Sequence, residues 1–186
     1  MKVIGLTGSI GSGKDTVKSF LINKLGATSV TLSDVIRAEL EKKRGIADRT
    51  TMQNMGNEMR QKYGAHILAM LAVEYLSRIK KFVIIDGIRN PVEADYLRKK
   101  FGSDFKLIAV DAPQQVRFER MQKRPNRNDP KTWEEFVASD NREMGDNEPE
   151  YGLQLRKCIS QADFVISNEG TVEELQKKID EVIQRI

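Results

Sequence analysis

One short stretch of the sequence has the residue types and the spacing needed to bind a polyphosphate. It reads Gly8-Ser9-Ile10-Gly11-Ser12-Gly13-Lys14-Asp15-Thr16, between the apolar run Val3-Ile4-Gly5-Leu6 and a helical pattern of apolar residues. In a glycine-rich turn between a strand and a helix, backbone N–H groups surround phosphate oxygens and the helix N-terminus adds its positive end. The lysine of such a turn reaches the β- and γ-phosphates. We therefore predict that the stretch from Gly8 to Thr16 binds ATP and that Lys14 acts in catalysis.

The residue after Lys14 departs from the usual form of this motif. The pattern G-x-x-x-x-G-K is normally followed by Ser or Thr, whose hydroxyl binds Mg²⁺, whereas Asp15 stands at that position here. Because Mg²⁺ accepts carboxylate oxygen readily, we expect Asp15 to bind the metal, directly or through water, with Thr16 as the alternative ligand. Asp86 ends the apolar run 82–85. It is typical of a second aspartate that holds the metal through its water shell, or else it caps the turn before the next helix.

Three arginines and one aspartate follow the predicted strands at points where a phosphate could be bound. Asp34 and Arg37 follow the second predicted strand, Arg60 lies in the helical segment after it, and Arg89 follows the third. Guanidinium groups bind phosphates bidentately and stay charged, so we expect these arginines to hold a phosphoryl group during transfer. Asp34 is the single candidate base for an acceptor that presents a hydroxyl group.

A second group of arginines surrounds a loop interrupted by prolines. Arg120, Arg124 and Arg127 run from the end of one predicted helix to Asp129-Pro130, which we expect to cap the next. Such a segment predicts a lid over about residues 120–145 that closes over the substrates and excludes water. Arg142, on the helix that follows, is a further candidate for binding phosphate.

Apolar segments alternate with helical patterns along the chain, and these elements must position the candidate residues. The expected strands cover about residues 2–7, 28–32, 82–85, 105–110 and 164–166. The alternation predicts an α/β fold in three layers, with a mainly parallel sheet of about five strands covered by helices on both faces. The carboxyl ends of the strands then border one crevice, which brings the loop at 8–16, Asp34 and Asp86 together. The run Asn90-Pro91-Val92-Glu93 predicts a capped helix start.

Length and composition limit the class of protein. The 186 residues include 31 basic and 27 acidic ones, for a formal net charge of +4, and the charges are interleaved along the chain. This balance suits a pocket for an anionic small molecule and lacks the one-sided stripe of a nucleic-acid binder. We expect a single domain over 1–186 with no membrane-spanning segment and no signal peptide. A lone cysteine, Cys158, fits a cytoplasmic location, and the oligomeric state stays open.

Taken together, these motifs resemble the P-loop kinases of the nucleoside-monophosphate-kinase superfamily over essentially the full chain. Residues 5–14 are similar to the opening of dephospho-CoA kinases, and the step Lys14-Asp15-Thr16 is similar to deoxynucleoside monophosphate kinases. Residues 85–89, the arginine-rich lid and residues 162–171 resemble archaeal adenylate-kinase-like proteins.

The resemblance implies a P-loop NTPase fold with a helical acceptor-binding segment at about 33–64 and a short lid. The residues that it implies for the acceptor are Arg37, Arg60 and Arg89; we expect Asp34 and Arg142 at the same substrate site from their own positions in the chain. For the lid side of the phosphates it implies Arg120, Arg124 and Arg127. For the adenine it implies the turn at 168–171, with Asn168 and Gly170.

Three hypotheses remain for the activity. The leading one is ATP- and Mg²⁺-dependent phosphoryl transfer to a small nucleotide, a nucleoside or deoxynucleoside monophosphate, because the arginines outnumber the one candidate base. The second is phosphorylation of a ribose hydroxyl of dephospho-CoA, for which Asp34 would accept the proton. The third is a nucleotide-binding ATPase without a small-molecule acceptor. A role in RNA binding would instead appear as a steeply salt-dependent affinity.

Overall fold

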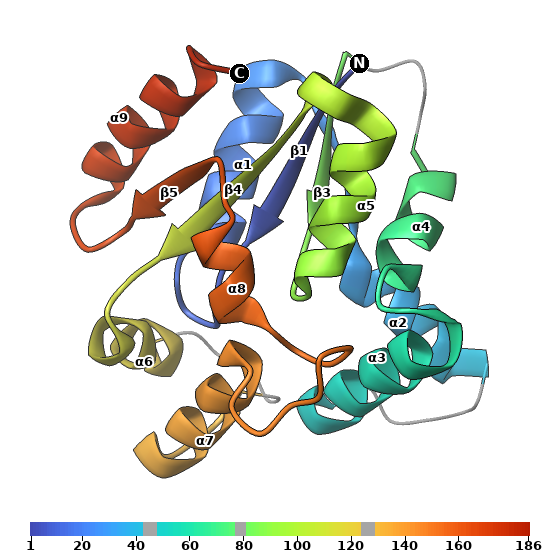
Figure 1. Ribbon diagram of the computed structural model, residues 1–186. Helices are drawn as coiled ribbons and strands as arrows, with labels where there is room; N and C mark the ends of the chain where they lie inside the picture. Colours follow the sequence, from blue (N-terminus) through green and yellow to red (C-terminus); the bar gives the residue numbers. More distant parts are fainter. Residues whose placement is uncertain (43–47, 77–80, 124–128) are drawn as a thin grey trace.

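The computed structural model describes residues 1–42, 48–76, 81–123 and 129–186. In these residues five strands form one sheet in the order β2-β3-β1-β4-β5, and each neighbouring pair is parallel (Figure 1). The strands are β1 (Lys2–Thr7), β2 (Thr28–Thr31), β3 (Phe82–Asp86), β4 (Phe105–Asp111) and β5 (Phe164–Ser167). The predicted parallel sheet of about five strands is therefore confirmed.

Helices cover both faces of the sheet, as the three-layer prediction requires (Figure 1). On one face lie α1 (Lys14–Leu25) and α9 (Val172–Ile183). On the other face lie α4 (Ile67–Glu74), α5 (Pro91–Phe101) and α8 (Leu155–Ser160). Successive strand residues point to opposite faces, so Ile4 and Ile108 pack in the core beneath α1 and α9, while Val3 and Leu107 pack in the core on the other side.

Further helices gather at the carboxyl ends of the strands (Figure 1). They are α2 (Leu32–Lys42), α3 (Arg49–Tyr63), α6 (Gln114–Gln122) and α7 (Trp133–Met144); a short 3-10 turn, η1 (Gly102–Asp104), precedes β4. Helices α2 and α3 fall in the segment expected to bind the acceptor, and α7 falls in the expected lid. A small apolar cluster in which Ile10, Met121 and Phe136 are buried ties α6 and α7 to the loop after β1. None of the helices in the described ranges is long and apolar enough to cross a membrane.

Two helix starts test the capping predictions. Asn90 Oδ1 accepts a hydrogen bond from Val92 N, and Glu93 Oε2 accepts one from Asn90 N, both at 3.0 Å, so the predicted capping box at α5 is confirmed. The prediction that Asp129 caps the helix after the lid loop is wrong. Helix α7 begins at Trp133, after Thr132, because Thr132 and Glu135 form the reciprocal box at the spacing that such a box requires.

Candidate active site

The loop at residues 8–13 connects β1 to α1 at the carboxyl edge of the sheet. Gly11 and Gly13 have φ angles of +75° and +92°, a region that residues with a Cβ rarely adopt. A Cβ at Gly11 would overlap the carbonyl oxygen of Arg117, and a Cβ at Gly13 would overlap the side-chain amide of Asn168. Backbone conformation and close packing therefore both require glycine here. The loop is supported from behind by α6 and by the turn after β5.

Two hydroxyl groups of the loop are buried and have no hydrogen-bond partner within the described residues. They are Ser9 Oγ and Ser12 Oγ, on residues that are 3% and 0% exposed. An unpaired buried polar group costs free energy, and a phosphate oxygen would provide the missing partner. The N-terminus of α1 adds its positive end, so the loop fits a triphosphate. The cleft in front of it, which we call the loop cleft, is lined by Gly8, Ser9, Gly11, Gly13, Lys14, Asp15 and Thr16 among others.

Asp86, at the end of β3, holds two lysines beside the loop. Its carboxylate accepts hydrogen bonds from Lys14 Nζ at 2.5 Å and from Lys18 Nζ at 2.7 Å. Burial alone would raise the pKa of Asp86, but the charges and hydrogen bonds of Lys14 and Lys18 outweigh burial and hold this pKa below its usual value. Lys18 was not predicted from the sequence, although its position one helical turn after Lys14 could have indicated it.

The three predicted metal ligands Asp15, Thr16 and Asp86 all line the loop cleft. The Asp15 carboxylate is 72% exposed and lies 3.4 Å from Lys18 Nζ. Among the residues of the four described ranges, no group of three or more His, Cys, Asp or Glu could hold a metal ion. Mg²⁺ is usually bound by one or two carboxylates together with substrate phosphates and waters. Two carboxylates beside a triphosphate-binding loop therefore fit this ion, and the choice between Asp15 and Thr16 stays a prediction.

A pocket of about 210 Å³, which we call the arginine pocket, adjoins the loop cleft. Both are lined by Lys14, Thr31, Ser33, Arg37, Arg49 and Arg89. The apolar lining of the arginine pocket includes Leu32, Ile36, Met52, Leu68 and Leu153. Its charged lining consists of Lys14, Arg37, Arg49, Arg60 and Arg89 against Asp48 and Asp129. Apolar walls with a few convergent charged groups are typical of a site for a small molecule, and the excess of basic groups favours an anion.

Arg60, on α3, borders the arginine pocket with its charge already paired. Its Nε and Nη2 atoms lie 2.9 and 2.8 Å from Glu93 Oε1. The other oxygen of Glu93 accepts hydrogen bonds from Arg89 N at 2.9 Å and from Asn90 N at 3.0 Å. Arg60 is 2% exposed and Glu93 is fully buried. Glu93 was predicted only as a capping residue, but it also fixes Arg60 and the backbone of Arg89.

Glu143, on α7, brings two arginines together. Its Oε1 atom accepts a hydrogen bond from Arg89 Nη1 at 2.7 Å and pairs with Arg49 Nη2. Burial of Glu143 alone would raise its pKa, but the charges of Arg89 and Arg49 outweigh burial and lower it. One carboxylate cannot neutralise two guanidinium groups, so a positive charge remains toward the pocket and the cleft. Neither Arg49 nor Glu143 was predicted, because nothing local marks a pairing across 94 positions.

Arg37 and the candidate base Asp34 form an exposed ion pair on the first turns of α2. Arg37 Nη1 lies 2.7 Å from Asp34 Oδ1, and the two side chains are 49% and 66% exposed. Both residues line the loop cleft, as the sequence predicted. The Asp34 carboxylate therefore lies at the loop cleft with its charge paired to a neighbouring guanidinium, and its role toward an acceptor stays a prediction.

Arg142, which was predicted to bind the acceptor, joins α7 to α3. Its Nε donates to Glu148 Oε1 at 2.6 Å, and its Nη2 donates to Asn54 Oδ1 at 2.8 Å. Arg142 lines a groove next to the arginine pocket and is absent from the described lining of that pocket. Its predicted contact with the acceptor stays a prediction.

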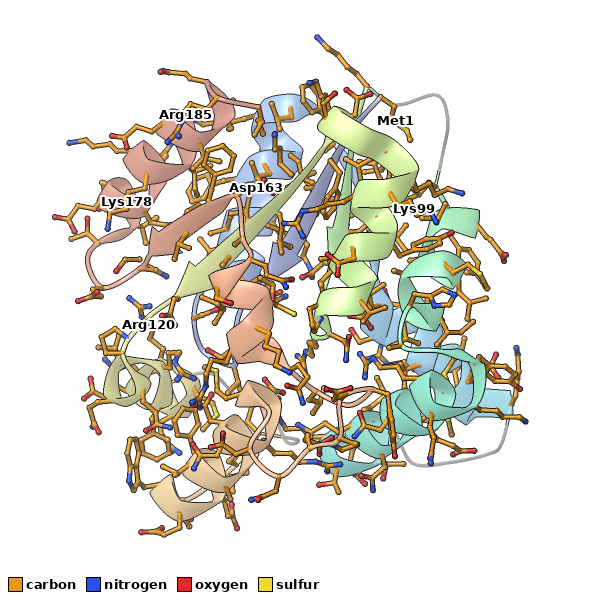
Figure 2. All side chains as sticks on the ribbon, in the orientation of Figure 1. Met1, Lys99, Arg120, Asp163, Lys178 and Arg185 are labelled. Atoms are coloured by element: carbon orange, nitrogen blue, oxygen red, sulfur yellow. The ribbon has the colours of Figure 1, made fainter. Side chains whose placement is uncertain are left out.

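Of the predicted lid arginines and adenine contacts, the structure describes Arg120, Asn168 and Gly170. Arg124 and Arg127 lie outside the described residues. Arg120 lies in the last turn of α6 (Figure 2), lines the loop cleft and donates from Nη1 to the carbonyl oxygen of Asn168 at 2.8 Å. Asn168 in turn donates from Nδ2 to Ser12 O at 2.8 Å, so it braces the loop, while Gly170 is exposed. Contact of Asn168 and Gly170 with an adenine stays a prediction.

The sequence is similar to a known domain family and to proteins of archaea. A family model described as an AAA domain matches residues 7–137. A UPF0200 protein of Pyrococcus horikoshii is 35% identical over 190 residues, which cover 99% of this chain and 97% of the relative.

Solved kinases share this architecture at low identity. A shikimate kinase from Acinetobacter baumannii, in complex with shikimate, superposes with a TM-score of 0.57 at 19% identity, covering 100% of this chain and 94% of that one. A gluconokinase from Sinorhizobium meliloti superposes with a TM-score of 0.60 at 14% identity, covering 99% and 92%. The predicted P-loop kinase fold is confirmed.

Proposed function

Since the chain belongs to the UPF0200 family, and its residues 7–137 to the AAA-domain family, we propose that it is an ATP- and Mg²⁺-dependent kinase. Its acceptor, in this proposal, is a small anion of the nucleoside or deoxynucleoside monophosphate class. One observation carries the proposal: the arginine pocket and the loop cleft share Lys14, Arg49 and Arg89. A triphosphate loop and a cationic pocket that meet at one lysine suit direct phosphoryl transfer.

In this proposal the protein contributes position and charge rather than covalent chemistry. Bound ATP with Mg²⁺ supplies the phosphoryl group and part of the charge neutralisation. Lys14 moves from Asp86 to the phosphates, while Asp86 keeps its bond with Lys18. Arg49 and Arg89, held by Glu143, bind the acceptor oxygens where the two spaces join. The apolar lining of the arginine pocket then holds the body of the acceptor.

The charged groups favour a phosphate acceptor over a hydroxyl acceptor. A phosphate is already ionised at neutral pH and needs cations close to it, which the site has in excess. A hydroxyl acceptor benefits from a carboxylate that takes up its proton. Asp86 is a poor candidate for that role because Lys14 and Lys18 lower its pKa. Of the other carboxylates that line the cleft, Asp15 is assigned to the metal in this proposal, and Asp34 is exposed and paired with Arg37.

An acceptor screen tests the proposal directly. ATP and Mg²⁺ are incubated with the protein and one acceptor at a time, and ³¹P NMR identifies the phosphorylated product. The acceptors are the common nucleoside and deoxynucleoside monophosphates, dephospho-CoA, shikimate and gluconate. Conversion of a monophosphate to a diphosphate is expected, with loss of the activity in Lys14→Ala. Lys24→Ala is the matched control, since Lys24 lies on the same helix but pairs with Asp180.

Two results would overturn the proposal at different levels. ADP release that no acceptor accelerates would indicate an ATPase rather than a kinase. Transfer to the ribose hydroxyl of dephospho-CoA, or to shikimate or gluconate, in place of a monophosphate would support kinase activity. It would reject the monophosphate as the acceptor.

A further inference from the structure

Lys18 is a second ammonium group on the buried carboxylate of Asp86. Its Nζ atom lies 2.7 Å from Asp86 Oδ2, and Lys14 Nζ lies 2.5 Å from Asp86 Oδ1. Each of the two carboxylate oxygens is therefore bound to one lysine. Burial alone would lower the pKa of Lys18, but its hydrogen bond to Asp86 and the charge of that group outweigh burial and raise the pKa above its usual value. Lys18 is thus charged at neutral pH.

The same lysine also lies near the carboxylate that replaces the usual hydroxyl of the motif. Lys18 Nζ is 3.4 Å from Asp15 Oδ1, and Lys14 Nζ is 3.7 Å from the same atom. Two carboxylates and two ammonium groups therefore form one compact cluster whose charges cancel. The change from a hydroxyl to Asp15 adds a negative charge beside Asp86, and Lys18 supplies the positive charge that offsets it.

This arrangement has a consequence for the metal. Asp15 and Asp86 are the carboxylates that fit Mg²⁺ in the loop cleft, and both lie within 3.7 Å of a lysine ammonium group. A divalent cation that arrives alone must approach two ammonium groups at short range, which is unfavourable. Lys14 is the lysine that a triphosphate draws away, whereas Lys18 keeps its position on Asp86.

We propose that Lys18 is a positioning residue that keeps divalent metal from Asp15 and Asp86 until the triphosphate is bound. The inference rests on the proposed function only in taking the loop cleft as the site of Mg²⁺ and ATP. Lys18 thereby makes metal binding depend on the nucleotide, because the charge of the phosphates is needed to overcome that of the lysine. Without Lys18, the two carboxylates bind a divalent ion directly.

The test measures metal affinity in the absence of nucleotide. Mn²⁺, which prefers the same oxygen ligands, is titrated into the full-length protein, and electron paramagnetic resonance reports the free ion. Lys18→Met should bind Mn²⁺ about tenfold more tightly than the wild type, or more, because one full charge is removed within a few ångströms of both carboxylates. Addition of a non-hydrolysable ATP analogue should reduce this difference.

Three variants make the test specific. Lys24→Met removes the same charge from the same helix, away from the cleft, and should leave Mn²⁺ affinity unchanged. Adding Asp86→Asn to Lys18→Met should abolish the gain. Lys18→Gln keeps a hydrogen-bond donor for Asp86 without the charge, so it should also bind Mn²⁺ more tightly. It replaces Lys18→Met in the titration if thermal unfolding shows that Lys18→Met does not fold.

Two outcomes would overturn the proposal. One is equal Mn²⁺ affinity, without nucleotide, of the wild type and a folded Lys18 variant that lacks the charge. The other is an equal gain in Lys24→Met, which would indicate a general charge effect. Neither readout involves phosphoryl transfer, so a failed acceptor screen and a failed metal titration are distinguishable.

Discussion

The loop cleft and the arginine pocket are built in different ways. The loop at 8–13 is one contiguous stretch, shaped by its glycine conformations and by packing against Arg117 and Asn168. The arginine pocket collects its arginines from α2, α3 and the turn after β3. Buried carboxylates on two further helices, Glu93 on α5 and Glu143 on α7, hold three of them. The first region depends on local backbone geometry, the second on ion pairs between distant segments.

This difference predicts how each region fails when it is altered. Truncating a side chain of the loop leaves its backbone support in place. Activity should therefore be lost while the fold is retained. Removing one partner of a buried ion pair leaves the other charge buried and unpaired, which is strongly destabilising. In the arginine pocket, activity and stability should therefore fall together.

The largest effect is expected from Lys14→Ala. Loss of a charge that neutralises the transferring group should lower kcat by about 10²–10³-fold or more, the range found when one such donor is removed. Asp86 retains Lys18 at 2.7 Å, so Tm should change by less than about 4 °C, the shift that about 1 kcal/mol causes in a chain of this length. Steady-state kinetics and calorimetry measure the two quantities. Near-normal turnover would contradict the role given to Lys14.

The next effect concerns stability and the pair Arg60–Glu93. Glu93→Gln should reduce the free energy of unfolding by about 3–5 kcal/mol, because it leaves the Arg60 charge buried and unpaired. Urea denaturation measures this change. The double variant Arg60→Met/Glu93→Gln is the control and should recover part of the loss, since no unpaired charge remains. If the free energy of unfolding fell in the double variant by the sum of the two single losses, Arg60 and Glu93 would not be coupled.

A smaller effect should appear in the pH dependence of stability. Because Arg89 and Arg49 hold the pKa of Glu143 below its ordinary value, despite burial, ionised Glu143 stabilises the fold above that ordinary value, about 4.3. This contribution is lost as the pH falls through the lower, folded-state pKa. The unfolding free energy of the wild type should therefore fall more steeply in acid than that of Glu143→Gln. Urea denaturation between about pH 3 and about pH 7 measures both curves, and parallel curves would contradict this expectation.

The smallest effect is expected from Asp34→Asn. An exposed ion pair such as Asp34–Arg37 contributes about 0.2–1 kcal/mol, so turnover should change by less than about fivefold. If the acceptor presented a hydroxyl group and Asp34 were its base, the rate would instead fall by about 10²–10⁴-fold. Initial rates with the best acceptor from the screen separate these outcomes.

The parts that could be predicted from the sequence are those with local causes. The loop at 8–16, the five strands and the capping box at Asn90 depend on neighbouring residues, so their patterns are visible in the chain. The pairings of Glu93 with Arg60 and of Glu143 with Arg49 join residues 33 and 94 positions apart. No spacing rule predicts them. Arg142 pairs with Glu148 and Asn54, which no spacing rule predicts either, and its contact with the acceptor stays a prediction.

In the mechanism that we propose, one acceptor phosphate meets the loop at Lys14, between the two regions. A crystal structure with a dinucleoside pentaphosphate, which joins donor and acceptor nucleosides in one molecule, tests it most directly. We predict that the phosphate chain runs from the loop past Lys14 to Arg49 and Arg89, with the second nucleoside in the arginine pocket. A second nucleoside outside that pocket, with neither Arg49 nor Arg89 in contact with a phosphate, would contradict the account.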